Sequence, residues 1–229
     1  MFINLLWLTQ NNTMATKKRA TPLELHSEEF TLAAPLDEAA INKILPVALT
    51  NGKRKERVLS FFAKERVITE STDAARDLYA QSRFGIVLED GKVQLSLHEA
   101  LYLLEKGRLT VKDYRKQELD FTAFLAKAKR IEPQFWIRYA VFKDLRNRGY
   151  IVKTALKFGA DFRVYDRGVK PGEDHARWVV YPVHEGSTLT WYEFAAKNRV
   201  AHSTKKRLLI GVVDDEGDVS YWEIKWLRP

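Results

Sequence analysis

The chain closes with Arg207-Leu-Leu-Ile-Gly-Val-Val213 and Val219-Ser-Tyr-Trp-Glu-Ile-Lys-Trp-Leu227, two apolar runs joined by the turn Asp214-Asp-Glu-Gly-Asp218. Runs rich in β-branched and aromatic residues around a glycine-containing turn are typical of paired strands. A helical pattern from about Thr190 to Ala201 precedes them, and further β-prone runs lie upstream, at residues 150–156, 161–165 and 177–183. This alternation predicts a compact α/β domain with a central mixed sheet.

The first half of the chain has a more helical pattern. Residues 36–80 place apolar side chains at helical spacing, starting with Ile41, Ile44 and Leu45. A hairpin is expected around the turn Glu89-Asp-Gly91, because Asp-Gly supplies a positive φ. These features predict an α-rich N-terminal domain with a small sheet, and so an α+β or α/β chain overall.

Two further helices are predicted in this half. Ser96 and Glu99 have the spacing of a capping box, and Gly107 is suited to end the helix that they begin. A short helix is expected from Phe121 to about Lys129.

Pro133 marks the expected boundary between the domains, and an amphipathic helix from Gln134 to Arg148 follows it. The predicted organisation is a partly helical extension at residues 1–60, an N-terminal domain at 61–130 and a catalytic domain at 131–229.

Composition limits the possible chemistry. The 229 residues carry a formal net charge of +8, which favours a polyanionic partner such as nucleic acid. There is no cysteine, which excludes thiolate catalysis and zinc–thiolate sites. No HExxH, Walker or GxGxxG pattern occurs, so we expect no metal and no cofactor.

The apolar start, residues 1–8, is too short to span a bilayer, and Met14 is an alternative translation start. We therefore expect a soluble, cytoplasmic protein with no membrane partner.

Three residue types with complementary chemistry occur near predicted strand ends. Tyr165 ends one strand, His175 lies between a polar loop and the next, and Lys205-Lys206-Arg207 leads from the last helix into a buried strand. An isolated histidine is most often an ordinary surface residue, but here a tyrosine and lysines accompany it. Together they fit metal-free RNA cleavage, in which the 2′-hydroxyl is the nucleophile. A tyrosine base, a histidine acid and a lysine that stabilises the phosphorane charge suffice.

The chain resembles the archaeal tRNA-splicing endonucleases. The resemblance rests on Phe158-Gly-Ala-Asp-Phe-Arg-Val-Tyr165, on His175 and on Arg199-Val-Ala-His-Ser-Thr-Lys-Lys206. It extends through Leu95-Ser-Leu-His-Glu-Ala-Leu-Tyr-Leu-Leu-Glu-Lys-Gly107 and covers roughly residues 65–229.

This resemblance implies cleavage of precursor tRNA at both intron boundaries within a bulge–helix–bulge, leaving 2′,3′-cyclic phosphate and 5′-hydroxyl ends. It implies that Tyr165 is the general base, His175 the general acid and Lys206 the charge stabiliser, with Lys205 as the rival lysine. It also implies that Arg199 and Trp226 hold a bulged base between them, with Trp222 as the second choice for the aromatic partner.

The turn Asp214-Asp-Glu-Gly-Asp218, taken alone, is an ordinary acidic hairpin turn. The resemblance implies that Asp214, Asp215, Glu216 and Asp218 dock into a basic groove on a neighbouring subunit. A chain with both this loop and a complete triad is expected to form a homotetramer, and a heterotetramer with a second subunit is the alternative.

Three other functions fit parts of this sequence less well. A non-catalytic RNA-binding structural subunit of the same endonuclease has no need of the complete triad. A plain RNA-binding module would not depend on His175. A restriction-like DNA nuclease would require paired acidic residues around a metal, which the predicted central strands lack.

Overall fold

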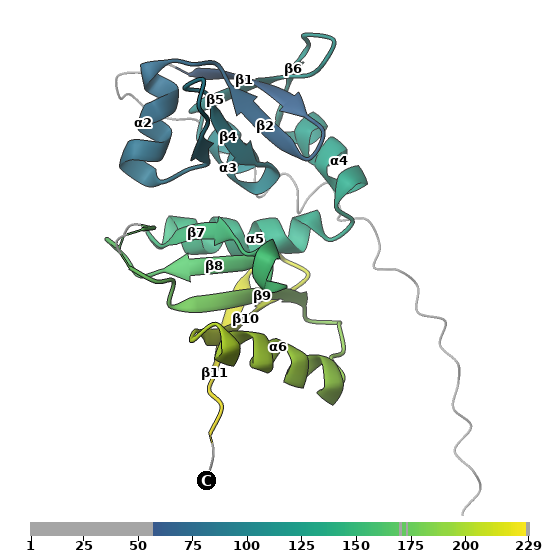
Figure 1. The fold of residues 1–229 in the computed structure, drawn as a ribbon. Coiled ribbons are helices and arrows are strands. Elements are labelled where there is room, and N and C mark those ends of the chain that lie inside the picture. The colour runs from purple at the N-terminus through teal and green to yellow at the C-terminus, as the bar shows by residue number, and fades with distance from the viewer. Residues whose placement is uncertain (1–56, 170, 173, 228–229) are drawn as a thin grey trace, which may run out of the picture. The chain divides into compact units, whose positions relative to one another are not determined.

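The computed structural model describes residues 57–169, 171–172 and 174–227 (Figure 1). Contacts divide the chain into residues 1–35 and 36–229, and all described residues belong to the second unit. Most of the predicted N-terminal extension, and the expected helix face formed by Ile41, Ile44, Leu45 and Leu49, lie outside the described residues. The boundary predicted between residues 130 and 131 stays a prediction.

The first sheet has six strands, in the order β3-β4-β2-β1-β5-β6. β1 and β5 are parallel and the other neighbouring pairs are antiparallel. The strands are β1 (Val58–Ala63), β2 (Arg66–Thr69), β3 (Ile86–Val87), β4 (Val93–Ser96), β5 (Leu109–Lys112) and β6 (Glu118–Leu119).

The predicted helical pattern is wrong at residues 58–69, which form the antiparallel pair β1–β2. Burial here alternates with a period of two. Val58 and Ser60 are buried in β1, and Val67 and Thr69 are buried in β2. This periodicity belongs to a strand, and the β-prone side chains favour it over the helical spacing of the preceding residues.

Three helices accompany the first sheet: α2 (Asp73–Ser82), α3 (Leu97–Glu105) and α4 (Phe121–Ile131). The capping box that begins α3 is confirmed, because the side chain of Ser96 accepts from Glu99 N and the side chain of Glu99 accepts from Ser96 N. Gly107 has φ 66° just beyond the helix, as expected of a residue that ends it. The hairpin β3–β4 is also confirmed.

The second sheet has five strands, in the order β11-β10-β9-β8-β7. β9 and β10 are parallel and the other neighbours are antiparallel. The elements are α5 (Phe135–Asn147), β7 (Ile151–Thr154), the 3₁₀ turn η1 (Leu156–Phe158), β8 (Phe162–Tyr165), β9 (Trp178–His184), α6 (Trp191–Ser203), β10 (Arg207–Val213) and β11 (Val219–Ile224).

Helices cover both faces of the second sheet, with α5 on one side and α6 on the other (Figure 1). Successive residues of the central strands enter different cores. Val180 and Leu209 pack in the cluster that includes α5, whereas Val179 and Leu208 pack with Ala201 of α6. Strands buried on both faces explain the nearly continuous apolar runs in the sequence. The predicted architecture of a mixed-sheet α/β domain is confirmed.

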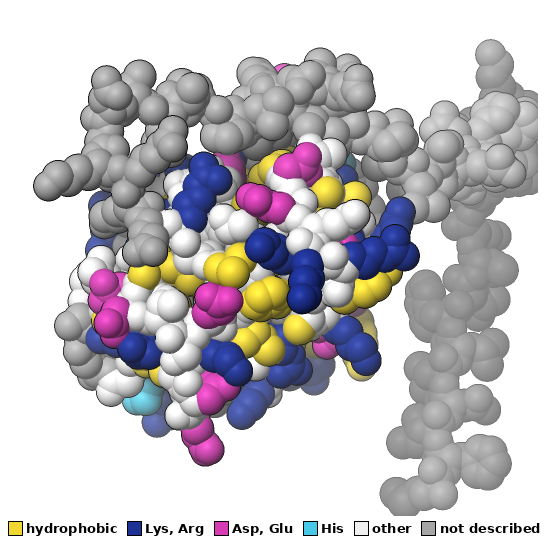
Figure 2. All heavy atoms as spheres, turned by 90° about the horizontal axis from the view of Figure 1, so that it is seen from above, with side chains coloured by type: hydrophobic (Ala, Val, Ile, Leu, Met, Phe, Trp, Pro, Cys, Tyr) yellow, Lys and Arg dark blue, Asp and Glu magenta, His cyan; other side chains and the backbone are white. Residues whose placement is uncertain are grey.

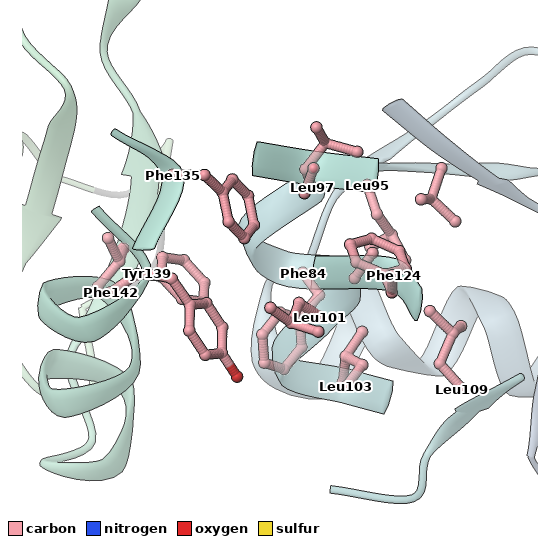
Figure 3. Packing of buried hydrophobic residues seen from close by; sticks show 14 of the residues in the cluster. Phe84, Leu95, Leu97, Leu101, Leu103, Leu109, Phe124, Phe135, Tyr139 and Phe142 are labelled. Atoms are coloured by element: carbon pink, nitrogen blue, oxygen red, sulfur yellow. The ribbon is translucent and has the colours of Figure 1, made fainter. Parts of the chain in front are cut away.

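The larger core also joins α5 to the elements of the first sheet. Figure 3 shows Phe135, Tyr139 and Phe142 of α5 facing leucine and phenylalanine side chains of the first half, including Leu97 and Leu101. All these side chains are buried. The two sheets thus share one continuous hydrophobic core.

The surface view in Figure 2 shows Lys and Arg side chains interspersed with acidic and apolar ones, rather than gathered in a single patch. In the described part of the chain, no helix combines the length and hydrophobicity needed to cross a membrane.

Candidate active site

The topology of the second sheet brings three separate segments to one edge. Because β9 and β10 are parallel and β8 is antiparallel to β9, the end of β8 lies beside the starts of β9 and β10. Backbone hydrogen bonds join these points. Arg177 N donates to Val164 O at 2.9 Å, and Arg207 N donates to Arg177 O at 3.0 Å. Residues just beyond this edge therefore meet although they are far apart in sequence.

Tyr165, His175 and Lys206 line one cavity of about 360 Å³ at this edge. Arg163, Gly172, Asp174 and Ala176 complete the described lining. The structure thus brings together the three residues expected to form the triad. Lys170 and Glu173 of the intervening loop lie outside the described residues.

Tyr165 is the last residue of β8 and is buried. Its strand position fixes the backbone, because Tyr165 is paired in register with Ile151 of β7. The guanidinium carbon of Arg163 lies 5.9 Å from the centre of the tyrosine ring. The guanidinium of Arg163 thus lies beside the phenol ring of Tyr165.

His175 is exposed and lies in the loop that leads into β9. Its backbone N donates to Asp174 Oδ1 at 2.6 Å. This contact constrains the backbone that carries the imidazole, while solvent reaches the residue itself. An accessible imidazole on a constrained backbone can deliver a proton to a leaving group.

Lys206 connects α6 to β10. Its backbone N donates to Ala201 O at 2.8 Å, and its Nζ donates to Thr204 O at 2.9 Å. Partial burial lowers the pKa of Lys206 from its usual value, and the positive charge of Arg163 lowers it further. The rival Lys205 is exposed, has φ 54°, and is not among the residues that line the cavity.

The two residues expected to hold a base lie near the C-terminal end of α6 and just beyond the end of β11, which pairs with the start of β10. Arg199 is exposed on α6. Trp226 is 46% exposed, and its ring centre lies 4.6 Å from that of His202, one helical turn after Arg199. Trp226 therefore lies beside the helix that carries Arg199. Trp222, the second choice, is exposed on β11.

The acidic turn 214–218 projects Asp215, Glu216 and Asp218 to solvent. Asp214 is more enclosed, and its Oδ1 accepts from Asp218 N at 2.8 Å. Asp215 Oδ1 lies 3.0 Å from His184 Nε2. The turn is thus shaped by internal hydrogen bonds that leave several carboxylates facing outward.

Three residues beside these sites were missed from the sequence: Arg163, His184 and His202. The sequence could have indicated Arg163, because residues two apart on a strand share a face and Tyr165 is a candidate catalytic residue. For His184 and His202 the partners lie across the fold, at Asp215 and Trp226. No local sequence pattern predicts such contacts. Among the described residues, no group of three or more His, Asp or Glu side chains could hold a metal ion.

Family models match both halves of the chain. The model of the tRNA intron endonuclease N-terminal domain matches residues 58–125, and that of the catalytic C-terminal domain matches residues 135–221. This chain belongs to the tRNA intron endonuclease family. The matched catalytic domain includes the three cavity residues, Arg199 and the acidic turn, whereas Trp226 lies just beyond it.

Individual relatives agree with this assignment. The chain is similar to a tRNA-splicing endonuclease of Nanoarchaeum equitans, at 49% identity over 149 residues, which are 62% of this chain and 94% of that one. It is 41% identical over 174 residues to a tRNA-splicing endonuclease of Thermococcus onnurineus, covering 76% of this chain and 99% of the relative. The corresponding protein of Methanothermobacter thermautotrophicus is 40% identical over 175 residues, with coverage of 76% and 99%.

Proposed function

We propose that this member of the endonuclease family cleaves precursor tRNA at intron boundaries presented in a bulge–helix–bulge, without a metal ion. The observation that carries the proposal is the convergence of Tyr165, His175 and Lys206 on one cavity. These side chains supply a base, an acid and a cation, which are the groups that attack by a neighbouring 2′-hydroxyl requires.

In the proposed reaction, Tyr165 removes the proton of the 2′-hydroxyl, whose oxygen then attacks the adjacent phosphorus. Lys206 stabilises the added negative charge on the phosphorane. His175 donates a proton to the 5′-oxygen as the bond to that oxygen breaks. The products are a 2′,3′-cyclic phosphate and a 5′-hydroxyl, and no water is consumed in this step.

We infer that Arg199 and Trp226 grip an unpaired base of the substrate. A bulged base exposes its π-face, and a guanidinium and an indole both stack on such a face. The contact of Trp226 with His202 supports this role, because it holds the indole beside the helix of Arg199 before RNA arrives. An indole held in place loses less entropy on binding.

The acidic turn and the exposed last strand point to self-association. Asp215, Glu216 and Asp218 gather negative charge in one turn of a chain with net charge +8, so a second copy offers a complementary surface. β11 is an edge strand that exposes Trp222 at 66%. We propose a homotetramer in which the turn of one subunit docks on another, and a heterotetramer with a second chain is the alternative.

Cleavage assays in EDTA test the proposed chemistry. A bulge–helix–bulge RNA and a matched RNA with 2′-deoxy at each cleavage site are incubated with the protein after removal of divalent ions. Cleavage of the first RNA alone supports the proposal. A requirement for added Mg²⁺, or cleavage of the deoxy RNA, contradicts it. Binding without any cleavage would favour a non-catalytic structural subunit.

The assembly is tested by measuring mass in solution for two matched variants. Glu216→Gln with Asp218→Asn removes two of the four carboxylates of the acidic turn, and Glu89→Gln with Asp90→Asn removes two carboxylates of the β3–β4 turn. We expect the first variant to dissociate into smaller species at concentrations where the wild type and the second variant remain tetrameric. A monomeric wild-type protein, or equal masses for all three, would overturn the docking proposal.

A further inference from the structure

Arg163 occupies a position in the cavity for which the proposed triad gives no reason. It lies on β8, two residues before Tyr165, and lines the cavity with Tyr165, His175 and Lys206. It also lines the adjoining groove of about 580 Å³. Arg163 therefore lines both the cavity and the groove.

Among the described residues, two lysines, Lys153 and Lys206, lie near Arg163. In the strand register it stands opposite Lys153 of β7. Burial lowers the pKa of Lys153, and the charge of Arg163 is among the further causes of that shift. Burial and the charge of Arg163 likewise lower the pKa of Lys206. The charge of Arg163 therefore disfavours the protonated form of each lysine, and Lys153 is compensated by its ion pair with Glu99.

In the part of the chain that the structure describes, the guanidinium of Arg163 lacks the acceptors that Arg138 and Arg146 have. Arg138 pairs with Glu132 and Asp161, and Arg146 donates to the carbonyls of Ser82 and Tyr150. Within the described residues, the side chain of Arg163 makes no ion pair or hydrogen bond, and its Nε is buried without an acceptor.

An enclosed N–H without an acceptor is destabilising, so this site is suited to a ligand that supplies a hydrogen-bond acceptor. Asp174, the carboxylate in the described cavity lining, accepts instead from the backbone N of His175.

We propose that Arg163 binds a non-bridging oxygen of the RNA phosphate at the cleavage site, as a second cation beside Lys206. This inference rests on the proposed RNA cleavage and adds a substrate contact to it. A guanidinium offers two N–H groups side by side, which matches the spacing of phosphate oxygens better than an ammonium does. Arg163 would hold the phosphate as it binds, and Lys206 would take up the charge added during attack.

The test compares Arg163→Gln and Arg163→Lys with a matched control, Arg76→Gln. Arg76 is on α2, where it pairs with Asp73 at 2.5 Å, so its loss removes the same charge away from the cavity. Two measurements are made on each protein. One is the single-turnover cleavage rate, and the other is the affinity for the uncleavable 2′-deoxy RNA as a function of salt.

For Arg163→Gln we expect cleavage to slow about 100-fold, the loss typical of removing one oxyanion donor. We also expect the slope of log affinity against log salt to become shallower by about 0.7 to 0.9, the value for one lost phosphate contact. Arg163→Lys should recover the wild-type slope and part of the cleavage rate, because lysine keeps the positive charge but lacks the two adjacent N–H groups of the guanidinium. The control should match the wild type in both measurements.

A wild-type slope together with a wild-type rate in Arg163→Gln would overturn the inference while leaving the proposed function intact. A slower rate with an unchanged slope would also overturn it, since that result assigns Arg163 a structural role. If Arg163→Gln unfolds, Arg163→Lys still tests the inference. A shallower slope of log affinity against log salt in this variant, which keeps the positive charge, would contradict phosphate binding by Arg163. Failure of the wild type to cleave any RNA would instead refute the proposed function.

Discussion

Glu99 Oε1 accepts a hydrogen bond from Lys153 Nζ at 3.0 Å, joining α3 to β7 of the second sheet across 54 residues of sequence. The two side chains are only 7% and 12% exposed. The same carboxylate accepts from Gly85 N at 2.9 Å, and Lys153 Nζ donates to Gly85 O at 2.7 Å. This buried group links the halves of the described chain through polar contacts as well as through the shared core.

Glu99→Ala should therefore destabilise the fold strongly. The substitution leaves the Lys153 ammonium and the Gly85 N–H enclosed without their carboxylate, and removes the capping box of α3 as well. We expect the free energy of unfolding in urea to fall by about 3–5 kcal/mol. Adding Lys153→Met should restore part of this loss, because it removes the unpaired charge. A single-variant loss below about 0.5 kcal/mol would show that the group contributes little.

His98 predicts a particular dependence of stability on pH. It stacks on Phe135 at 4.5 Å and meets Phe162 edge-on at 5.3 Å. Burial, and to a lesser extent the charge of Arg138, lowers its pKa from 6.5 to about 3, although Glu132 Oε2 lies 3.7 Å from Nε2. The folded state therefore keeps this imidazole neutral where the unfolded chain protonates it.

The stability due to neutral His98 is fully present above pH 6.5 and is lost as pH falls toward 3. Its slope reaches about 1.4 kcal/mol per pH unit. His98→Phe should flatten the curve of unfolding free energy against pH between 6 and 4 by roughly one proton, as urea titrations at several pH values would measure. Identical slopes in variant and wild type would contradict a depressed histidine pKa.

Gly211 allows β10 to pack closely on α5. A Cβ added at this position would lie 2.9 Å from Val141 Cγ2 and 3.4 Å from Tyr221 Cε1. Gly211→Ala should cost about 1–3 kcal/mol of unfolding free energy, as expected for an overpacked core. Val141→Ala in the same protein should relieve the contact, so that the double variant is more stable than the sum of the single effects predicts. Strict additivity would exclude this contact as the cause.

Substitutions in the cavity separate catalysis from folding. Tyr165→Phe and His175→Ala should each slow cleavage by about 10²–10⁴-fold, and Lys206→Ala by about 10²–10³-fold. His175 is exposed, so its variant should retain the wild-type melting temperature. Binding of 2′-deoxy RNA should persist in all three. Lys205→Ala is the matched control, and a larger loss there than in Lys206→Ala would reverse the choice between the two lysines.

Local patterns predicted much of this fold because their causes are local. The capping box Ser96–Glu99, the turn at Gly91 and the alternation of apolar runs with α6 each depend on a few neighbouring residues. The helical prediction fails at residues 58–69 because it extends the helical spacing of the preceding sequence into two strands. Their mutual pairing is local, whereas the pairing of β1 with β5 joins segments some fifty residues apart.

The site was predicted unevenly for the same reason. The positions of Tyr165 and His175 at the ends of predicted strands indicated that they are candidate catalytic residues, and the resemblance favoured Lys206 over Lys205. The pairing of Lys153 with Glu99 and the missing partner of Arg163 depend on distant segments. Only the three-dimensional arrangement reveals whether a buried charge is paired.

The chemical identity of the cleaved ends tests the central claim most directly. Product RNA from a bulge–helix–bulge substrate, made in EDTA, is analysed by mass spectrometry before any enzymatic treatment. Attack by the 2′-hydroxyl predicts a 2′,3′-cyclic phosphate on the upstream fragment and a 5′-hydroxyl on the downstream one. A 3′-hydroxyl with a 5′-phosphate would mean that water attacked the phosphorus, and would contradict the roles proposed for Tyr165, His175 and Lys206.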